Sequence, residues 1–294
     1  MSRRAEGNPS GWPGVVTTPW QVTLTALEHA KRAAQWFQVP IVQRGNRNLR
    51  RLAAEERAVV VVVADDPLKL YLEPDFDHPL FFHPGMAHQR LAAISSGQSD
   101  RLVRAADVRS GDVVVDATLG PGTDSLVLAA AVGASGRVVA MESSPWLARL
   151  FRWGQRHEAA RYPSIVALLE RISVLEGEHT ELLAELKQNS VDIVYFDPMF
   201  RHPIYHETAN IEGARWLTDA SAVVDAAWTL AQRATRRSVV LKERPYSGEF
   251  ERFGLLPDKP RAKLAYGVWK KEGFRGEETP ARSVYRRAHS NRKE

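Results

Sequence analysis

Cysteine is absent from this sequence of 294 residues, and its absence excludes several kinds of site. Disulfide frameworks, thiolate zinc sites, iron–sulfur clusters and cysteine nucleophiles all need a thiol. Long apolar runs are missing too, because the longest, Ala58 to Ala64, is far shorter than the ~20 residues of a membrane helix. The basic start Met1-Ser2-Arg3-Arg4 leads into glycine and prolines rather than an apolar stretch, so we expect no signal peptide. The expectation is a cytoplasmic protein without a membrane partner.

Positive charge is in slight excess. The chain has 40 Lys and Arg against 35 Asp and Glu, a net charge of +5. This balance suits a polyanion such as nucleic acid, although many basic proteins bind none. Residues 1–13 are expected to be a flexible leader, and residues 273–294 a basic tail. The tail is either an unstructured end without function or an arm that contacts phosphates.

Residues 14–98 are expected to form a small α/β module. Thr18 is predicted to cap a helix with Pro19 in its first turn, because Gln21 completes a capping box and apolar residues recur as far as Phe37. Strand and turn patterns predict the remaining elements. The strands are expected at 15–17, 40–43, 59–63 and 68–72, the last two forming a hairpin, and a further helix at 49–56.

Residues 99–272 alternate strand and helix in the βαβ manner, which predicts a doubly wound, mostly parallel sheet. The predicted strands are 113–115, 137–141, 172–175, 193–196 and 238–241, with 264–269 as an antiparallel edge. The predicted helices are 123–132, 145–160, 178–187 and 219–233.

The turn after the first of these strands has the residues of a cofactor loop. The apolar strand ends in Asp116, and Gly120 and Gly122 allow a close backbone approach before a helix opens. Glu142, at the end of the next strand, is placed to accept hydrogen bonds from both hydroxyls of a ribose. The alternatives are a turn whose glycines serve packing alone and a dinucleotide site, which would need a Gly-x-Gly-x-x-Gly pattern that the loop lacks.

S-adenosylmethionine (SAM) fits the loop better. The pattern of SAM-binding loops is Asp-x-Gly-x-Gly-x-Gly, in which Asp116, Gly120 and Gly122 match and Thr118 replaces the first glycine. SAM has no pyrophosphate to enclose, and an acidic strand end suits its cationic methionine part.

The segment Asp197-Pro198-Met199-Phe200 ends a strand beside the switch point where doubly wound sheets bind ligands. It is a variant of the Asp/Asn-Pro-Pro-Tyr/Phe motif of amino-group methyltransferases. Asp197 and the Pro198 carbonyl are expected to accept the two N–H groups of an exocyclic amine, and Phe200 to stack on a flipped base. The plainer alternative is a buried aspartate and an aromatic residue at a strand end.

With the glycine loop, Asp124 and this motif, the sequence resembles class I SAM-dependent methyltransferases of the RsmJ type. A further shared feature is the segment 81–90, which begins Phe-Phe-His-Pro-Gly-Met-Ala-His. The resemblance covers about residues 80 to 270. It implies a seven-stranded-type Rossmann-like sheet, SAM as cofactor, and methylation of guanine N2 in ribosomal RNA. It departs at Arg201-His202-Pro203, where the ribosomal enzymes have a lysine-containing stretch.

For three other candidate site segments the sequence leaves two interpretations open. Gly177 and Glu178 follow the third strand, where Glu178 either accepts from the adenine amino group or caps the next helix. Segment 81–90 is either a wall on the substrate side or a buried linker. Lys242-Glu243-Arg244 either meets phosphate or is a solvated cluster. His202 and His206 are four residues apart, but Pro203 between them argues against a metal site, and we expect no metal.

The predicted function is therefore transfer of a methyl group from SAM to a nucleobase amine in RNA, with guanine N2 of ribosomal RNA as the leading acceptor. Transfer RNA, DNA or a protein amide are alternative acceptors, and an RNA-binding protein without catalysis is the alternative function. The predicted SAM residues are Asp116, Thr118, Gly120, Gly122, Asp124, Glu142, Gly177, Glu178 and Asp197. The predicted catalytic residues are Asp197, Pro198 and Phe200.

Overall fold

The computed structural model describes residues 11–73, 75–85, 87–198 and 223–272, which form two sheets. The smaller sheet has the order β1-β2-β3, with β1 and β2 parallel and β2 and β3 antiparallel. The predicted hairpin is therefore confirmed. The elements are β1 (Gly14–Thr17), α1 (Leu24–Phe37), α2 (Leu49–Glu56), β2 (Val60–Val63) and β3 (Lys69–Leu72).

The predicted start of α1 is wrong. Thr23, not Thr18, is the N-cap, and its side chain accepts a hydrogen bond from the backbone N–H of Ala26. Thr18 is instead buried beyond the end of β1, so a capping pattern in the sequence marked the wrong threonine. The strand expected at 40–43 is reduced to one isolated bridge between Val16 and Ile41.

The larger sheet has the order β6-β5-β4-β7-β8-β9, in which only β9 is antiparallel. This is the doubly wound, Rossmann-like arrangement predicted from the sequence, including the antiparallel edge, with six strands in the described residues. The strands are β4 (Val113–Asp116), β5 (Arg137–Glu142), β6 (Ile172–Glu176), β7 (Val191–Phe196), β8 (Thr235–Glu243) and β9 (Ala265–Lys270).

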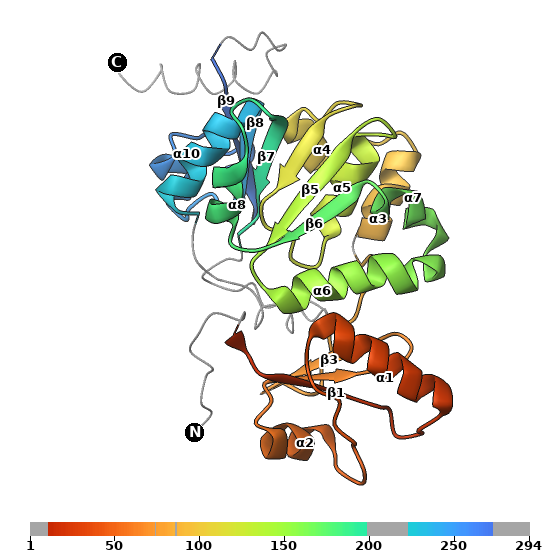
Figure 1. Cartoon of the computed structure of the whole chain (residues 1–294). Helices are drawn as coiled ribbons and strands as arrows, with labels where there is room; N and C mark the ends of the chain where they lie inside the picture. The colour runs from red at the N-terminus through yellow and green to blue at the C-terminus, as the bar shows by residue number, and fades with distance from the viewer. Residues whose placement is uncertain (1–10, 74, 86, 199–222, 273–294) are drawn as a thin grey trace.

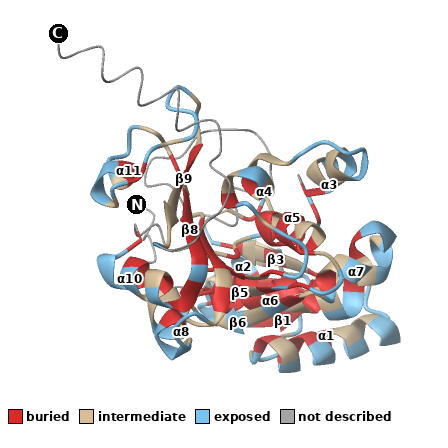
Figure 2. Cartoon of the chain, turned by 90° about the horizontal axis from the view of Figure 1, so that it is seen from above, coloured by how far each residue is buried: buried red, intermediate tan, exposed pale blue. Residues whose placement is uncertain are grey.

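Helices cover both faces of this sheet (Figures 1 and 2). One apolar cluster joins the sheet to α3, α4, α5 and α7, and another joins it to α8, α10 and α11. The bounds are α3 (Ala87–Ser95), α4 (Arg101–Ala106), α5 (Thr123–Ala131), α6 (Pro145–Trp153), α7 (Val166–Leu169), α8 (His179–Glu185), α10 (Asp225–Ala234) and α11 (Glu249–Arg252). A π-helical turn at Gly154–Glu158 continues α6. Among the described helices, none has the length and apolar character needed to cross a membrane.

Helix α6 packs between the large sheet and α1, and it lies above α1 in Figure 1. Its Trp146 and Trp153 pack into the cluster formed by α1 and the small sheet. The Trp36 indole N–H donates to the Arg149 carbonyl oxygen at 2.9 Å, and the Arg149 guanidinium donates to the Phe37 carbonyl oxygen at 2.7 Å. Phe82, which precedes α3, and Ala87, which begins it, pack against the large sheet and not against the small one. The boundary at residue 98 remains a prediction.

Candidate methyltransferase site

The predicted site residues meet at one edge of the large sheet. Strands β4, β5, β6 and β7 are parallel, so their carboxyl ends face the same way. Asp116 pairs in register with Tyr195, and Glu142 with Glu176. The edge therefore gathers Asp116, Glu142, Gly177 and Asp197, which lie up to 81 residues apart in the chain.

Asp116 shapes its own loop. Its buried carboxylate accepts hydrogen bonds from the Thr118 backbone N–H at 3.1 Å and from the Ser125 hydroxyl at 2.6 Å. Burial raises the pKa of Asp116 to about 7. These contacts tie the end of β4 to the first turn of α5. Asp116 was predicted to bind SAM, and that role remains a prediction.

The two glycines of the loop differ in what surrounds them. Gly122 has φ +82°, and a Cβ there would overlap the ring of Phe151. Gly120 has φ +51°, but a Cβ there would meet nothing closer than the Thr118 carbonyl oxygen at 4.0 Å. Gly122 is therefore needed for packing, whereas Gly120 leaves room beside the loop.

Glu142 closes the other side of this loop. Its carboxylate accepts from the backbone N–H groups of Gly120 at 2.9 Å and Ser144 at 2.8 Å. The side chain is buried, and burial raises the pKa of Glu142 to about 7. The cofactor loop and the end of β5 are thus held together at the position where the sequence predicts ribose recognition.

Glu178 is the N-cap of α8. Its carboxylate accepts from the backbone N–H groups of Thr180 at 2.6 Å and Glu181 at 3.2 Å. Of the two interpretations of Glu178, the structure shows the cap. Gly177 precedes it, and its N–H donates to the Glu142 carbonyl oxygen at 2.9 Å, which joins the ends of β5 and β6.

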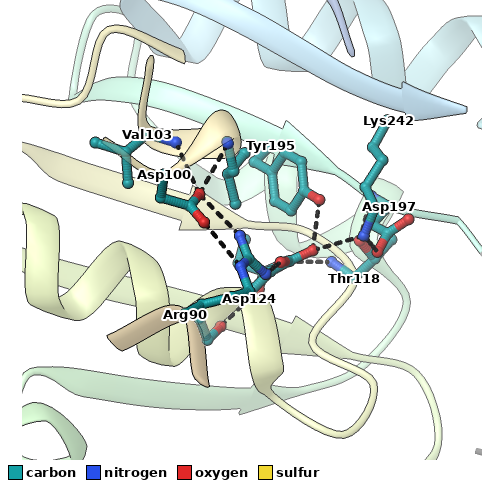
Figure 3. A network of polar contacts seen from close by, with 11 residues as sticks. Arg90, Asp100, Val103, Thr118, Asp124, Tyr195, Asp197 and Lys242 are labelled. Carbon is teal, nitrogen blue, oxygen red and sulfur yellow. Dashed lines mark hydrogen bonds and ion pairs between the residues drawn. The ribbon is translucent and has the colours of Figure 1, made fainter. Parts of the chain in front are cut away.

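Asp197 follows β7 and is held from two sides. Its backbone N–H donates to the Thr118 hydroxyl at 2.6 Å, and its carboxylate Oδ2 accepts from the Lys242 ammonium at 2.6 Å (Figure 3). Thr118 therefore fastens the reaction motif to the cofactor loop. Burial and the nearby Asp124 carboxylate raise the pKa of Asp197 to about 6, although Lys242 opposes this rise.

The position of Lys242 corrects the sequence analysis. The segment 242–244 was expected to meet phosphate or to be a solvated cluster, yet the Lys242 side chain is only 18% exposed and pairs with two aspartates. Since β8 lies beside β7, its carboxyl end arrives at the same edge as Asp197. A lysine at a strand end carries no sequence signal for this pairing, which is why the analysis missed it.

Asp124 is the centre of a charged network in Figure 3. Its carboxylate accepts from the Tyr195 hydroxyl at 2.6 Å and from Lys242 at 3.0 Å, and it pairs with Arg90. Arg90 also makes two bonds of 2.9 Å to Asp100. Burial acts against ionisation of Asp124, but Lys242 and Arg90 hold its pKa well below the usual range. Asp124 was predicted to bind SAM, and that role remains a prediction.

Part of the predicted site lies outside the described residues. This holds for Met199, Phe200, the segment Arg201-His202-Pro203 and His206. Pro198 is described and buried. Among the described residues, no group of three or more His, Asp or Glu side chains is arranged to hold a metal ion.

Known proteins resemble this chain in sequence and in fold. Residues 47–250 match a family described as "Putative SAM-dependent methyltransferase". The Bacillus subtilis protein named "Uncharacterized protein YpiP" is 32% identical over 256 residues, which cover 86% of this chain and 98% of that protein. The chain belongs to the SAM-dependent methyltransferase family.

A further relative supports this assignment, and a solved structure shares the fold. "Ribosomal RNA small subunit methyltransferase J" of Pseudomonas aeruginosa is 30% identical over 259 residues, covering 80% of this chain and 92% of that enzyme. A crystal structure of a SAM-dependent methyltransferase from Neisseria gonorrhoeae superposes with a TM-score of 0.54 at 19% identity, covering 90% of this chain and 99% of that one. This class I methyltransferase is thus of the RsmJ-like kind and uses SAM.

The residues present fit SAM. Gly120 leaves open the space that a Cβ would occupy, and the carboxylate of Glu142 stands beside it on a neighbouring strand. Strand β6 ends next to them, and Gly177, which has no side chain, follows it directly. SAM would therefore meet a glycine loop, an acidic group and a glycine turn at the ends of three adjacent strands.

Proposed function

We propose that this methyltransferase transfers a methyl group to an exocyclic amine of a nucleobase in RNA, with guanine N2 of small-subunit ribosomal RNA as the acceptor. The observation that carries the proposal is the position of Asp197. Asp197 stands at the carboxyl end of β7, where its backbone N–H is bound by the Thr118 hydroxyl of the cofactor loop and its carboxylate by Lys242 of β8. An aspartate fastened beside the cofactor loop can position an acceptor rather than only stabilise the fold.

SAM supplies, when bound, a methyl group on a sulfonium that an amine can attack. The chain's own contribution is orientation. The lone pair of a nucleobase amine is delocalised into the ring, and it localises when both N–H groups are bound. Asp197 and the Pro198 carbonyl are the acceptors that we assign to those N–H groups, and Phe200 is assigned to stacking on the base. The proton leaves the nitrogen once it carries the methyl group.

The same edge of the sheet has features that suit RNA. Glu243 pairs with Ala265 in the β8–β9 ladder, so residues 244–264 begin and end at the carboxyl edge. Tyr246 in this segment is 75% exposed, and Lys259 and Arg261 are exposed as well. An aromatic ring and cationic side chains are the usual partners of unpaired bases and phosphates. The name of the Pseudomonas relative points to the same acceptor class.

A comparison of nucleosides tests this function. Total RNA from a wild-type strain and from a strain lacking the gene is digested and analysed by mass spectrometry, and the purified protein is then incubated with labelled SAM and small ribosomal subunits of the deletion strain. We expect loss of N2-methylguanosine in the deletion strain and transfer of label in vitro. Loss of a methylated transfer RNA nucleoside, a DNA base or a protein amide would reassign the acceptor.

Asp197→Ala separates the enzyme from an RNA-binding protein without catalysis. We expect this variant to bind SAM but to lose transfer by at least a hundredfold, since the acceptor would no longer be oriented. Thr229→Ala, on the outer side of α10, is a matched control because its hydroxyl bonds only within the helix. Full activity of Asp197→Ala would refute the assigned role of the motif.

A further inference from the structure

The acidic residue of the reaction motif has a charged partner from another strand. We propose that Lys242 is a positioning residue for methyl transfer: its ammonium keeps the Asp197 carboxylate ionised and fixed in orientation, so that this carboxylate accepts an N–H of the methyl acceptor. The inference rests on the proposed function, because it assigns a residue to the same site. It goes beyond the motif, since Lys242 lies 45 residues after Asp197.

The geometry makes Lys242 a bridge between two carboxylates. The ammonium lies 2.6 Å from Oδ2 of Asp197 and 3.0 Å from Oδ2 of Asp124 (Figure 3). Asp124 is in turn held by Tyr195 and Arg90. Asp124 is therefore held in place, and Lys242, which is bound to it, sets the orientation of Asp197. Oδ1 is the oxygen that we assign to the acceptor.

The charges around the bridge explain why a cation is needed there. Asp197 is exposed at only a quarter of its side-chain surface and faces the carboxylate of Asp124. Burial and a like charge both favour the protonated acid, which would donate a hydrogen where the amine needs an acceptor. Lys242 opposes both effects. The charged and titratable groups around the pair are Arg90 of α3, Asp116 of β4, Asp124 of α5, Tyr195 of β7 and Tyr266 of β9.

Protonation links this arrangement to a measurable pH profile. Removing an opposite charge within about 4 Å raises the pKa of a carboxyl group by about 1–3 units. Lys242→Met should therefore move the acidic limb of the kcat profile upward by at least one pH unit. A shift from about 6 to about 8 would leave roughly a tenth of Asp197 ionised at pH 7, so kcat there should fall about tenfold and recover toward pH 9.

Two further variants bracket the effect. Lys242→Arg keeps the positive charge and should leave the acidic limb in place while kcat falls, because a larger cation displaces the carboxylate. Asp124→Asn removes the like charge, and it should move the limb downward. A residue that only stabilised the fold would lower activity at every pH and would not move the limb in opposite directions.

The experiment measures kcat and KM between pH 5 and 9 with labelled SAM and small ribosomal subunits of the deletion strain. SAM affinity by calorimetry checks each variant's fold. A second measurement needs no acceptor: the ¹³C carboxyl resonance of Asp197, assigned by its loss in Asp197→Asn, is titrated in wild type and variants. If Lys242→Met does not fold, Asp124→Asn and Lys242→Arg are measured in both ways.

The outcomes separate the inference from the proposed function. An upward shift in Lys242→Met, or a downward shift in Asp124→Asn with none in Lys242→Arg, supports the role of Lys242. An unmoved limb and an unmoved carboxyl titration overturn it, even where wild type methylates the subunits. Absence of methyl transfer by wild type to any RNA overturns the proposed function, and the carboxyl titration still decides whether Lys242 controls Asp197.

Discussion

Replacing Gly122 with alanine should lower the free energy of unfolding, because Gly122 is surrounded by packed atoms. A Cβ at this position would lie 2.7 Å from Cδ2 of Phe151 and closer still to Cε2. Phe151 is buried in the large-sheet cluster, so its ring has little room to move. The backbone of Gly122 also has φ +82°, which alanine adopts only with strain.

The two effects can be added to an approximate cost. The left-handed backbone costs alanine about 1–2 kcal/mol, and overpacking of a core costs about 1–3 kcal/mol. The loss of chain entropy in the unfolded state returns about 0.4–1 kcal/mol. A net loss of about 1–5 kcal/mol in the free energy of unfolding follows. In a chain of 294 residues each kcal/mol lowers the Tm by about 1.6 °C, because the unfolding entropy is about 2.1 cal/mol/K per residue.

Gly120→Ala is the matched control. It has the backbone cost alone, because a Cβ there meets only the Thr118 carbonyl oxygen at 4.0 Å. The added methyl group would instead occupy space that we assign to SAM, so SAM affinity should fall at least tenfold. Stability should fall by no more than about 1.6 kcal/mol, because the unfolded-state entropy again returns about 0.4–1 kcal/mol. Urea unfolding and calorimetric SAM titration of both variants are the assays. Equal stability of the two, or unchanged SAM affinity in Gly120→Ala, would refute the assignment.

Four other predictions concern polar groups that are buried or partly buried. Glu142→Ala should weaken SAM affinity at least tenfold by calorimetry, and unchanged affinity would remove Glu142 from the ribose role. Burial raises the pKa of Glu142 to about 7, so its ionisation disfavours folding. The free energy of unfolding of wild type should therefore fall by up to about 3 kcal/mol relative to Glu142→Gln as pH rises from 4.5 to 8. A pH-independent difference between the two in urea unfolding would contradict this. Arg90→Met should cost about 3 kcal/mol, since it leaves the buried carboxylate of Asp124 with one cation fewer, and a cost below 1 kcal/mol would show that Lys242 suffices. Trp36→Phe should cost about 1 kcal/mol because it removes the bond to the Arg149 carbonyl oxygen, and an unchanged unfolding midpoint would show that this bond contributes nothing.

Local patterns were sufficient for the large sheet. The run Val113–Val115 is apolar on both faces, as a covered parallel strand must be, and the alternation with helices continued to β8. The glycine loop and the Asp197 motif could be recognised for the same reason, because each is a contiguous stretch whose chemistry depends on neighbours in the chain. The start of α1 could not be recognised in this way, since Thr18, which has the capping pattern, is buried beyond β1 and the helix starts after Thr23.

The sequence by itself therefore determined the fold class, the cofactor and the kind of reaction, all of which depend on short segments with fixed spacing. Only the tertiary structure decided which side chains act on Asp197. Arg90, Asp124 and Lys242 come from three elements separated by up to 152 residues, and no periodicity links them. The order of strands in the sheet places β8 next to β7. For this reason Lys242, which was expected in solvent or on phosphate, pairs with Asp197.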